Sequence, residues 1–229
     1  MDDLFPDRVL TEQALTRGDV ERLLASSPYH LIDCDLDEAD LSGLNLSRWK
    51  FERCSFRRCD FSRGNLEGTV WQSCRGAFAN FTGSDLSEAV LIASDFNNAS
   101  FKYSTPASAS FSQCKLTGAD LSGVKAADVH FDETLLVNAK IPEHSFRKER
   151  LRRIDFSQCD LRKCDFRLAT FEECSLRDAD MDGSRFEGAD LRGADLGGLR
   201  LADAGLFRGA TISREQATQI LSELGINVR

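Results

Sequence analysis

The chain has 229 residues, a formal net charge of −8 and 41% hydrophobic residues. This hydrophobic share supports a buried core and excludes a disordered acidic tail. The acidic balance argues against direct binding of nucleic acid through phosphate neutralisation. No apolar run approaches the length that spans a bilayer, and the N-terminal MDDLFPDRVL carries acids where a signal peptide needs cations. We therefore expect a cytoplasmic protein without membrane contact.

Residues 1–30 show helical spacing rather than any shorter repeat. Between Thr11 and Ser26, apolar residues follow the pattern of an amphipathic helix, and either Thr11 or Asp19 is a suitable N-cap. The segment predicts one or two short helices that form an N-terminal cap over residues 1–30.

A period of five residues begins at Leu31 and continues without a slip to Leu206. Leu, Phe, Ile, Met or Trp fills 33 of these 36 positions, and the exceptions are Gly76, Pro106 and Ala126. Two residues before each large residue, 29 of 35 positions hold Ala, Cys, Ser, Thr, Val or Gly. This period matches neither a helix nor a flat strand. It predicts a chain that turns a corner every five residues and sends one large and one small side chain inward.

All eight cysteines lie in the small-residue phase of this repeat. The alternatives for them are disulfides, zinc ligands, redox thiols or core residues. Cysteines in CSFRRC and CDLRKC are five residues apart, and no His joins them in phase, so we expect inert, inward-facing thiols. No catalytic triad order, phosphate-binding loop or metal motif is present. The sequence therefore predicts a protein without cofactor, metal or enzymatic activity.

The repeated motif [A/C/S]-[D/N]-[L/F]-[S/T/R]-[G/x], in which x is any residue, resembles that of the pentapeptide-repeat family over residues 31–211. The resemblance implies an all-β fold, a right-handed quadrilateral parallel β-helix with four repeats per coil and about nine coils. Large residues twenty apart, such as Leu31, Phe51 and Trp71, are then expected to stack in columns.

Three places break the pattern: residues 104–108, 124–130 and 142–153. The last, PEHSFRKERLRR, has poor corner residues and a cluster of cations. It predicts either a projecting loop of ten residues or a bulged coil with a solvated basic patch. The candidate loop residues are Arg147, Lys148, Arg150, Arg152 and Arg153.

Residues 212–229 predict a C-terminal helix followed by a short strand. Ser213 and Gln216 form a capping-box pattern, an apolar stripe follows, and Gly225 is a natural stop. Such a short amphipathic helix needs a surface, either its own last coil or a second subunit. The ending ILSELGINV resembles the topoisomerase-protecting branch of the family (Qnr, MfpA, McbG, AlbG), which implies a head-to-head homodimer. The expected dimer residues are Ile220, Leu221, Leu224, Ile226 and Val228.

Five carboxylates share one phase of twenty and are expected on one face: Asp40, Asp60, Asp120, Asp160 and Asp180. One interpretation is a column that imitates DNA phosphates; the other is that each Asp bonds the backbone of its own turn. The resemblance implies a DNA mimic that binds DNA gyrase or topoisomerase IV and protects it from poisons such as fluoroquinolones, albicidin or microcin, with residues 142–153 as a further contact. The alternatives are an interaction module unrelated to gyrase and, more weakly, a secreted effector with a signal in residues 1–30.

Overall fold

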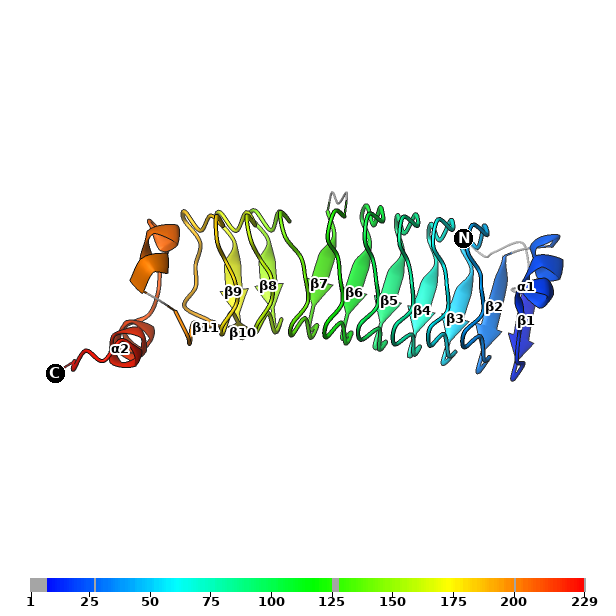
Figure 1. Ribbon diagram of the computed structural model, residues 1–229, viewed down its shortest axis with the longest axis horizontal. Coiled ribbons are helices and arrows are strands. Elements are labelled where there is room, and N and C mark those ends of the chain that lie inside the picture. Colours follow the sequence, from blue (N-terminus) through cyan, green and yellow to red (C-terminus); the bar gives the residue numbers. More distant parts are fainter. Residues whose placement is uncertain (1–7, 27, 125–127, 200, 229) are drawn as a thin grey trace, which may run out of the picture. The chain divides into compact units, whose positions relative to one another are not determined.

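The computed structural model describes residues 8–26, 28–124, 128–199 and 201–228 (Figure 1). The chain divides into two compact units, residues 1–130 and 131–229, and each is described by itself. Both consist of stacked coils of a right-handed, four-sided parallel β-helix, so the predicted fold class is confirmed.

Each five-residue repeat follows the same local geometry. The large central residue and the small corner residue are buried, as for Leu36 and Cys34. Two residues after the centre the backbone adopts positive φ, for example 60° at Glu38. A hydrogen bond then closes the turn, from the Ala39 amide to the Leu36 carbonyl at 3.2 Å. Because β-branched residues avoid positive φ, these turn positions hold polar residues or Gly in most repeats.

Unit 1 holds six parallel strands on one side of its coils (blue to green in Figure 1). Neighbouring strands pair in steps of twenty residues, so that Leu31 lies opposite Phe51 and Phe51 opposite Trp71. This register produces the expected columns of large residues. The strands are β1 (Arg8–Thr11), β2 (Tyr29–Ile32), β3 (Lys50–Glu52), β4 (Val70–Gln72), β5 (Val90–Ile92) and β6 (Ser110–Ser112).

The N-terminal segment carries one short helix, as predicted, together with a strand that the sequence did not indicate. It contains strand β1, which pairs with β2, and a single helix, α1 (Arg17–Leu24). The N-cap is Thr16, rather than Thr11 or Asp19, and Asp19 completes its capping box. Leu10 lies opposite Leu31, a step of 21 residues instead of twenty. The extra residue accommodates α1, and it places β1 out of phase with the repeat that starts at Leu31.

Unit 2 contains shorter runs of sheet and two further helical elements. Strands β7 (His130–Asp132, which starts at the unit boundary), β8 (Arg150–Arg152) and β9 (Thr170–Glu172) form one side. Strands β10 (Cys174–Ser175) and β11 (Ala194–Asp195) pair separately. The 3₁₀ helix η1 (Leu201–Phe207) replaces the last two predicted repeats, and Asp190 consequently pairs with Thr211, again a step of 21.

Helix α2 (Arg214–Glu223) follows the last coil and begins as predicted. The Ser213 hydroxyl accepts from the Gln216 amide, which confirms the capping box, and Gly225 has φ 78° at the helix end. The Gln216 side-chain amide donates to the Leu191 and Ala194 carbonyls at 2.6 Å each, so the helix caps open backbone groups of the coil. The expected strand at residues 226–228 does not form, because no strand of the described chain lies there to pair with it.

Candidate partner-binding surfaces

The predicted acidic column exists in unit 1, where Asp40 lies directly beside Asp60 in register. Asn80 and Ser100 follow in the next two coils and separate Asp60 from Asp120. The positions of the column therefore repeat regularly, but its negative charge is interrupted at Asn80 and Ser100.

Each aspartate of this column bonds the backbone of its own turn. The Oδ1 atoms of Asp40, Asp60 and Asp120 accept the amide N–H two residues further on, at 2.8 to 3.0 Å. Two of them also have cationic partners: Arg17 lies 3.3 Å from Asp40, and Lys102 lies 3.3 Å from Asp120. The turn-bonding interpretation thus accounts for much of why Asp stands here.

The two predicted acids of unit 2, Asp160 and Asp180, also lie side by side. Arg162 binds Asp160 through two nitrogens at 2.8 and 2.7 Å and reaches Asp180 at 3.7 Å. Its hydrogen bonds lower the pKa of Asp160 below the usual range. Asp160 therefore stays ionised at neutral pH, and one guanidinium offsets part of the charge of the two carboxylates.

Residues 142–153 form a regular coil, so the prediction of a projecting loop is wrong. The amides of Glu143, Phe146 and Lys148 donate to the next coil in the ordinary pattern, at 2.8 to 3.0 Å. The Phe146 ring stacks on Phe166 with centroids 4.9 Å apart. The segment looked irregular because His144 and Glu149 occupy corners that small residues fill elsewhere.

The structure separates the five candidate loop cations into two groups. Arg150, Arg152 and Arg153 pair with Glu172, Asp132 and Glu133 on the strand side of the coils. Arg147 and Lys148 lie at the preceding corner and are exposed. Within the described ranges neither of these two side chains has an ion pair.

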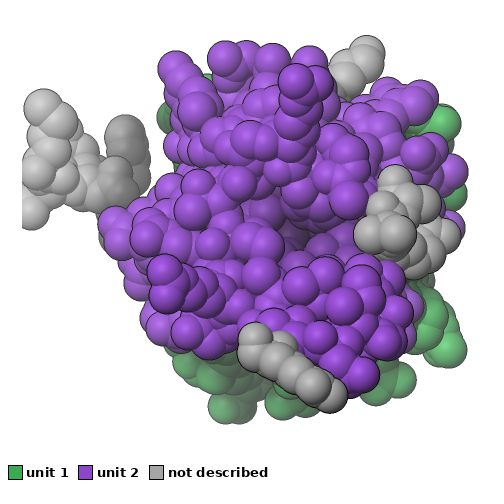
Figure 2. Space-filling view, turned by 90° about the vertical axis from the view of Figure 1, so that its left-hand side faces the viewer, with its two compact units in different colours: residues 1–130 green, residues 131–229 purple. Residues whose placement is uncertain are grey.

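The end of unit 2 that carries α2 has two hollows, and Figure 2 views the molecule from this side. The more polar one, of about 340 Å³, is lined by Asp178, Asp180 and Asp203 among others. The other, of about 240 Å³, is almost entirely apolar. Its lining residues are Leu196, Leu199, Ala204, Phe207, Ile212, Ile220 and Leu224.

The predicted dimer residues are thus divided between the chain's own coil and solvent. Ile220 and Leu224 line the apolar hollow, and Leu221 is half-buried. Ile226 and Val228 are 48% and 47% exposed. The helix covers its own last coil incompletely and leaves apolar surface at the C-terminus.

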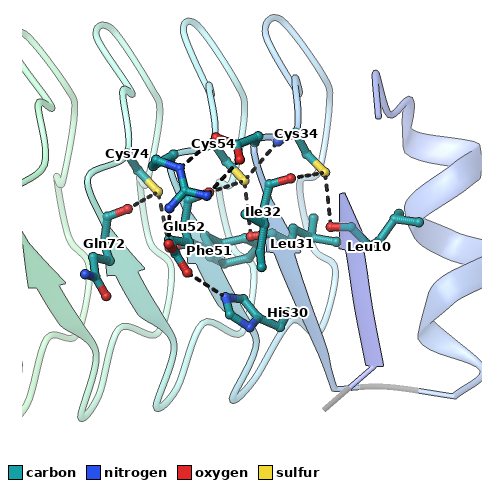
Figure 3. Close-up of polar contacts among 12 residues, drawn as sticks. Leu10, His30, Leu31, Ile32, Cys34, Phe51, Glu52, Cys54, Gln72 and Cys74 are labelled. Carbon is teal, nitrogen blue, oxygen red and sulfur yellow. Dashed lines mark hydrogen bonds and ion pairs between the residues drawn. The ribbon is translucent and has the colours of Figure 1, made fainter. Parts of the chain in front are cut away.

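The eight cysteines are all buried and free, which confirms them as core residues. Figure 3 draws three of them, Cys34, Cys54 and Cys74, with their polar contacts in neighbouring coils. Burial raises the pKa of Cys54 and of Cys74 to about 12, so both thiols stay protonated. In the described part of the chain no group of His, Cys, Asp or Glu has the arrangement of a metal site.

Sequence reasoning missed that cysteine thiols donate hydrogen bonds to central carbonyls of the preceding coil. Cys159 and Cys164 do so to Leu136 and Ile141 at 2.6 and 3.1 Å, and at one corner such bonds recur along the chain. At the other three corners, a backbone amide bonds the central carbonyl, as Cys59 does to Phe56 at 3.0 Å. At the corner after the strands, a thiol takes this place: the Cys54 Sγ donates to the Leu31 carbonyl at 3.4 Å. Ser94 uses its hydroxyl in the same way. The signal was the recurrence of donors every twenty residues, at Cys34, Cys54, Cys74, Ser94, Cys114, Thr134 and Cys174.

The geometry repeats with the five-residue motif, and the family comparison agrees. A family model described as pentapeptide repeats matches in eight copies, over residues 31–70, 77–105, 107–141, 150–188 and 171–206. The chain belongs to the pentapeptide-repeat family. Comparison with curated protein sequences gives no match for this pentapeptide-repeat protein. None of its described helices is long and apolar enough to cross a membrane.

Several solved structures resemble this pentapeptide-repeat protein. A trypsin-treated form of QnrB1, a plasmid-mediated fluoroquinolone resistance protein, is 20% identical with a TM-score of 0.55, covering 98% of this chain and all of that one. Full-length QnrB1 is 21% identical with a TM-score of 0.50, covering 95% and 100%. HetL, from the cyanobacterium Nostoc, is 20% identical with a TM-score of 0.36, covering 81% and 86%. At these identities the QnrB1 structures establish a shared fold.

Proposed function

We propose that this pentapeptide-repeat protein binds DNA gyrase or topoisomerase IV in the cytoplasm, at the site where the enzyme holds DNA, and protects it from topoisomerase poisons. The observation that carries the proposal is the end-to-end match with QnrB1, which spans 98% of this chain and all of its counterpart. The match includes both ends of the β-helix, where a protein that merely shared the repeat would differ most.

The proposed mechanism is binding without catalysis. The formal net charge of −8 favours approach to a basic, DNA-binding surface, and complementary charge accelerates association. Local pairing with Arg17, Lys102 and Arg162 weakens the single acidic column, so shape and total charge contribute more than any one carboxylate. Protection would follow from competition with DNA or from displacement of the poison.

We further propose that the protein acts as a homodimer through its C-terminus. The apolar hollow at α2 and the exposed Ile226 and Val228 support this, because a second copy would cover both. A paired C-terminal segment would also supply the strand partner that residues 226–228 lack among the described residues of one chain.

The acidic column is tested by removing charge without removing the turn bond. Asp40→Asn, Asp60→Asn and Asp120→Asn together keep the side-chain oxygen that accepts the turn amide, as Asn45 and Asn65 already do. The matched control replaces Asp35, Asp85 and Asp95, which make the same turn bond on other faces. If only the first triple variant binds gyrase more weakly, the contact lies on this face. If both variants lose binding equally, only the total charge of the protein matters.

The alternative function is an interaction module unrelated to gyrase. Family membership allows it, since HetL is described as a pentapeptide-repeat protein involved in the regulation of heterocyst differentiation. A pull-down with the full chain separates the two proposals: gyrase subunits favour the first, and a different specific partner favours the second.

A further inference from the structure

One corner of unit 2 carries positive charge that its surroundings do not neutralise. The Lys148 amide donates to the Arg167 carbonyl at 3.0 Å, which sets Arg147 and Lys148 directly beside Arg167 and Leu168 of the next coil. Arg147 and Arg167 hold the same repeat position in adjacent coils, an arrangement of like charges that costs stability. Because this repulsion destabilises the coil and is nevertheless present, it suggests that the surface has a binding role.

The carboxylate at the centre of this side is already bound. Asp165 accepts two bonds from Arg167, at 2.8 and 2.7 Å, and one from Arg185 at 3.0 Å. The bonds from Arg167 come first among the causes that lower the pKa of Asp165 to about 2. On this side, formed by residues 145–148, 165–168 and 185–188, Arg147, Lys148, Arg167 and Arg185 stand against Asp165 and Glu187, an excess of two positive charges in a chain of net charge −8.

An apolar side chain lies within the same surface. Leu168 is 49% exposed and has a positive φ of 62°. It leans over Gly188 of the following coil, where an added Cβ would come within 2.7 Å of the Leu168 Cδ2 atom. Because Gly188 has no side chain, Leu168 has room to lie against the backbone of that coil.

The aromatic residues of these coils point inward. Phe146, Phe166 and Phe186 are fully buried and stack on one another. Single-stranded nucleic acid is usually bound by cations together with exposed aromatic rings. A surface of cations around an exposed leucine instead matches an acidic polypeptide that carries an apolar residue.

We infer that this surface, the basic corner formed by Arg147, Lys148, Arg167, Leu168 and Arg185, binds an acidic segment of a protein partner, with Asp or Glu residues on either side of an aliphatic one. Here the surface of this protein is basic, whereas the surface proposed to bind gyrase is acidic. The inference therefore does not depend on whether gyrase is a partner.

The test measures fluorescence anisotropy of the full chain at low salt with three labelled probes. The first is a short peptide of Asp and Glu residues around one Leu, the second has Gly in place of that Leu, and the third is a single-stranded DNA of similar charge. The test variant is Arg147→Gln with Lys148→Gln. The matched control is Arg150→Gln with Arg152→Gln, which removes the same two charges from side chains that are already paired.

We expect the test variant to bind the first peptide about tenfold more weakly, and the control to change by less than about threefold. Leu168→Asn should weaken binding of the first peptide but not of the second. Equal losses in both double variants, DNA binding as tight as peptide binding, or no peptide binding by the natural chain would each overturn the inference. Unchanged thermal melting of the variants verifies that they fold.

Discussion

Gly76 takes a central repeat position because the Phe96 ring of the next coil fills its space. A Cβ added to Gly76 would lie 2.2 Å from the Phe96 Cε1 atom. In the same coil Trp71 is oversized, and its ring lies between 4.3 and 5.9 Å from those of Phe51, Phe56, Phe61, Phe81 and Phe96. The smallest residue thus compensates for the largest within one layer of the core.

Restoring the repeat at this position should harm the protein. Gly76→Leu matches the motif, yet it overpacks the layer, and we expect a loss of about 1–3 kcal/mol in the free energy of unfolding. Phe96→Leu combined with Gly76→Leu should recover part of this loss, since it removes the ring that fills the space at Gly76. Urea unfolding measures both. An unchanged midpoint for Gly76→Leu would contradict the compensation.

The thiol hydrogen bonds at the corner after the strands predict that two similar cysteines contribute differently to stability. Cys54→Ala removes the donor to the Leu31 carbonyl and should cost about 1 kcal/mol, because one buried hydrogen bond is lost. The control is Cys59→Ala, which loses the same sulfur at a corner where a backbone bond closes the turn and where Ala39 and Ala79 occupy the neighbouring coils. Cys54→Ser should keep most of the stability. Equal losses for the two alanine variants would exclude the donor role.

His144 predicts a specific weakening at acid pH. Its Nε2 atom is buried without a hydrogen-bond partner in the described chain, and burial lowers its pKa from 6.5 to about 4. The unfolded chain therefore binds a proton at a pH where the folded chain does not. The contribution of the neutral imidazole to the free energy of unfolding is fully present above pH 6.5. It is lost as the pH drops from 6.5 towards 4, which lowers that free energy by up to about 3 kcal/mol.

The matched variant for this effect is His144→Cys, which copies Cys164 at the same corner of the next coil. The variant should lose the part of the pH dependence between 6.5 and 4 that belongs to the imidazole, while effects of carboxylates stay common to both proteins. Parallel pH profiles from chemical unfolding would refute the assignment.

The proposed dimer gives a direct prediction for helix α2. Leu221→Asp places a charge in the apolar stripe and should convert dimers into monomers, as measured by light scattering. Thr218→Asp adds the same charge on the exposed side of the helix and should leave the mass unchanged. A monomeric natural chain, or a dimer that survives Leu221→Asp, would argue against this interface.

The repeat made the fold predictable because each coil uses the same residue types at the same corners. Strand β1 escaped prediction since α1 adds one residue and shifts Leu10 out of phase with Leu31. Of the two alternatives for residues 142–153, the projecting loop is wrong because backbone bonds and the Phe146–Phe166 stack hold a coil despite its poor corner residues.

The predicted surfaces depended on information that spacing does not carry. The twenty-residue register predicts that Asp160 lies beside Asp180. It does not predict that the Arg162 guanidinium pairs with both carboxylates. Likewise the five cations of 142–153 looked alike in sequence, and only the facing acids of other coils separate Arg147 and Lys148 from the rest. Side-chain partners twenty residues away decide which charges remain available.

Gyrase protection is tested most directly by DNA supercoiling with purified gyrase and ciprofloxacin, titrated with the full-length chain. The proposed function predicts that supercoiling recovers as the protein is added, and that the protein alone inhibits supercoiling at higher concentration as it competes with DNA. No recovery, together with no binding to gyrase at micromolar concentration, would contradict it.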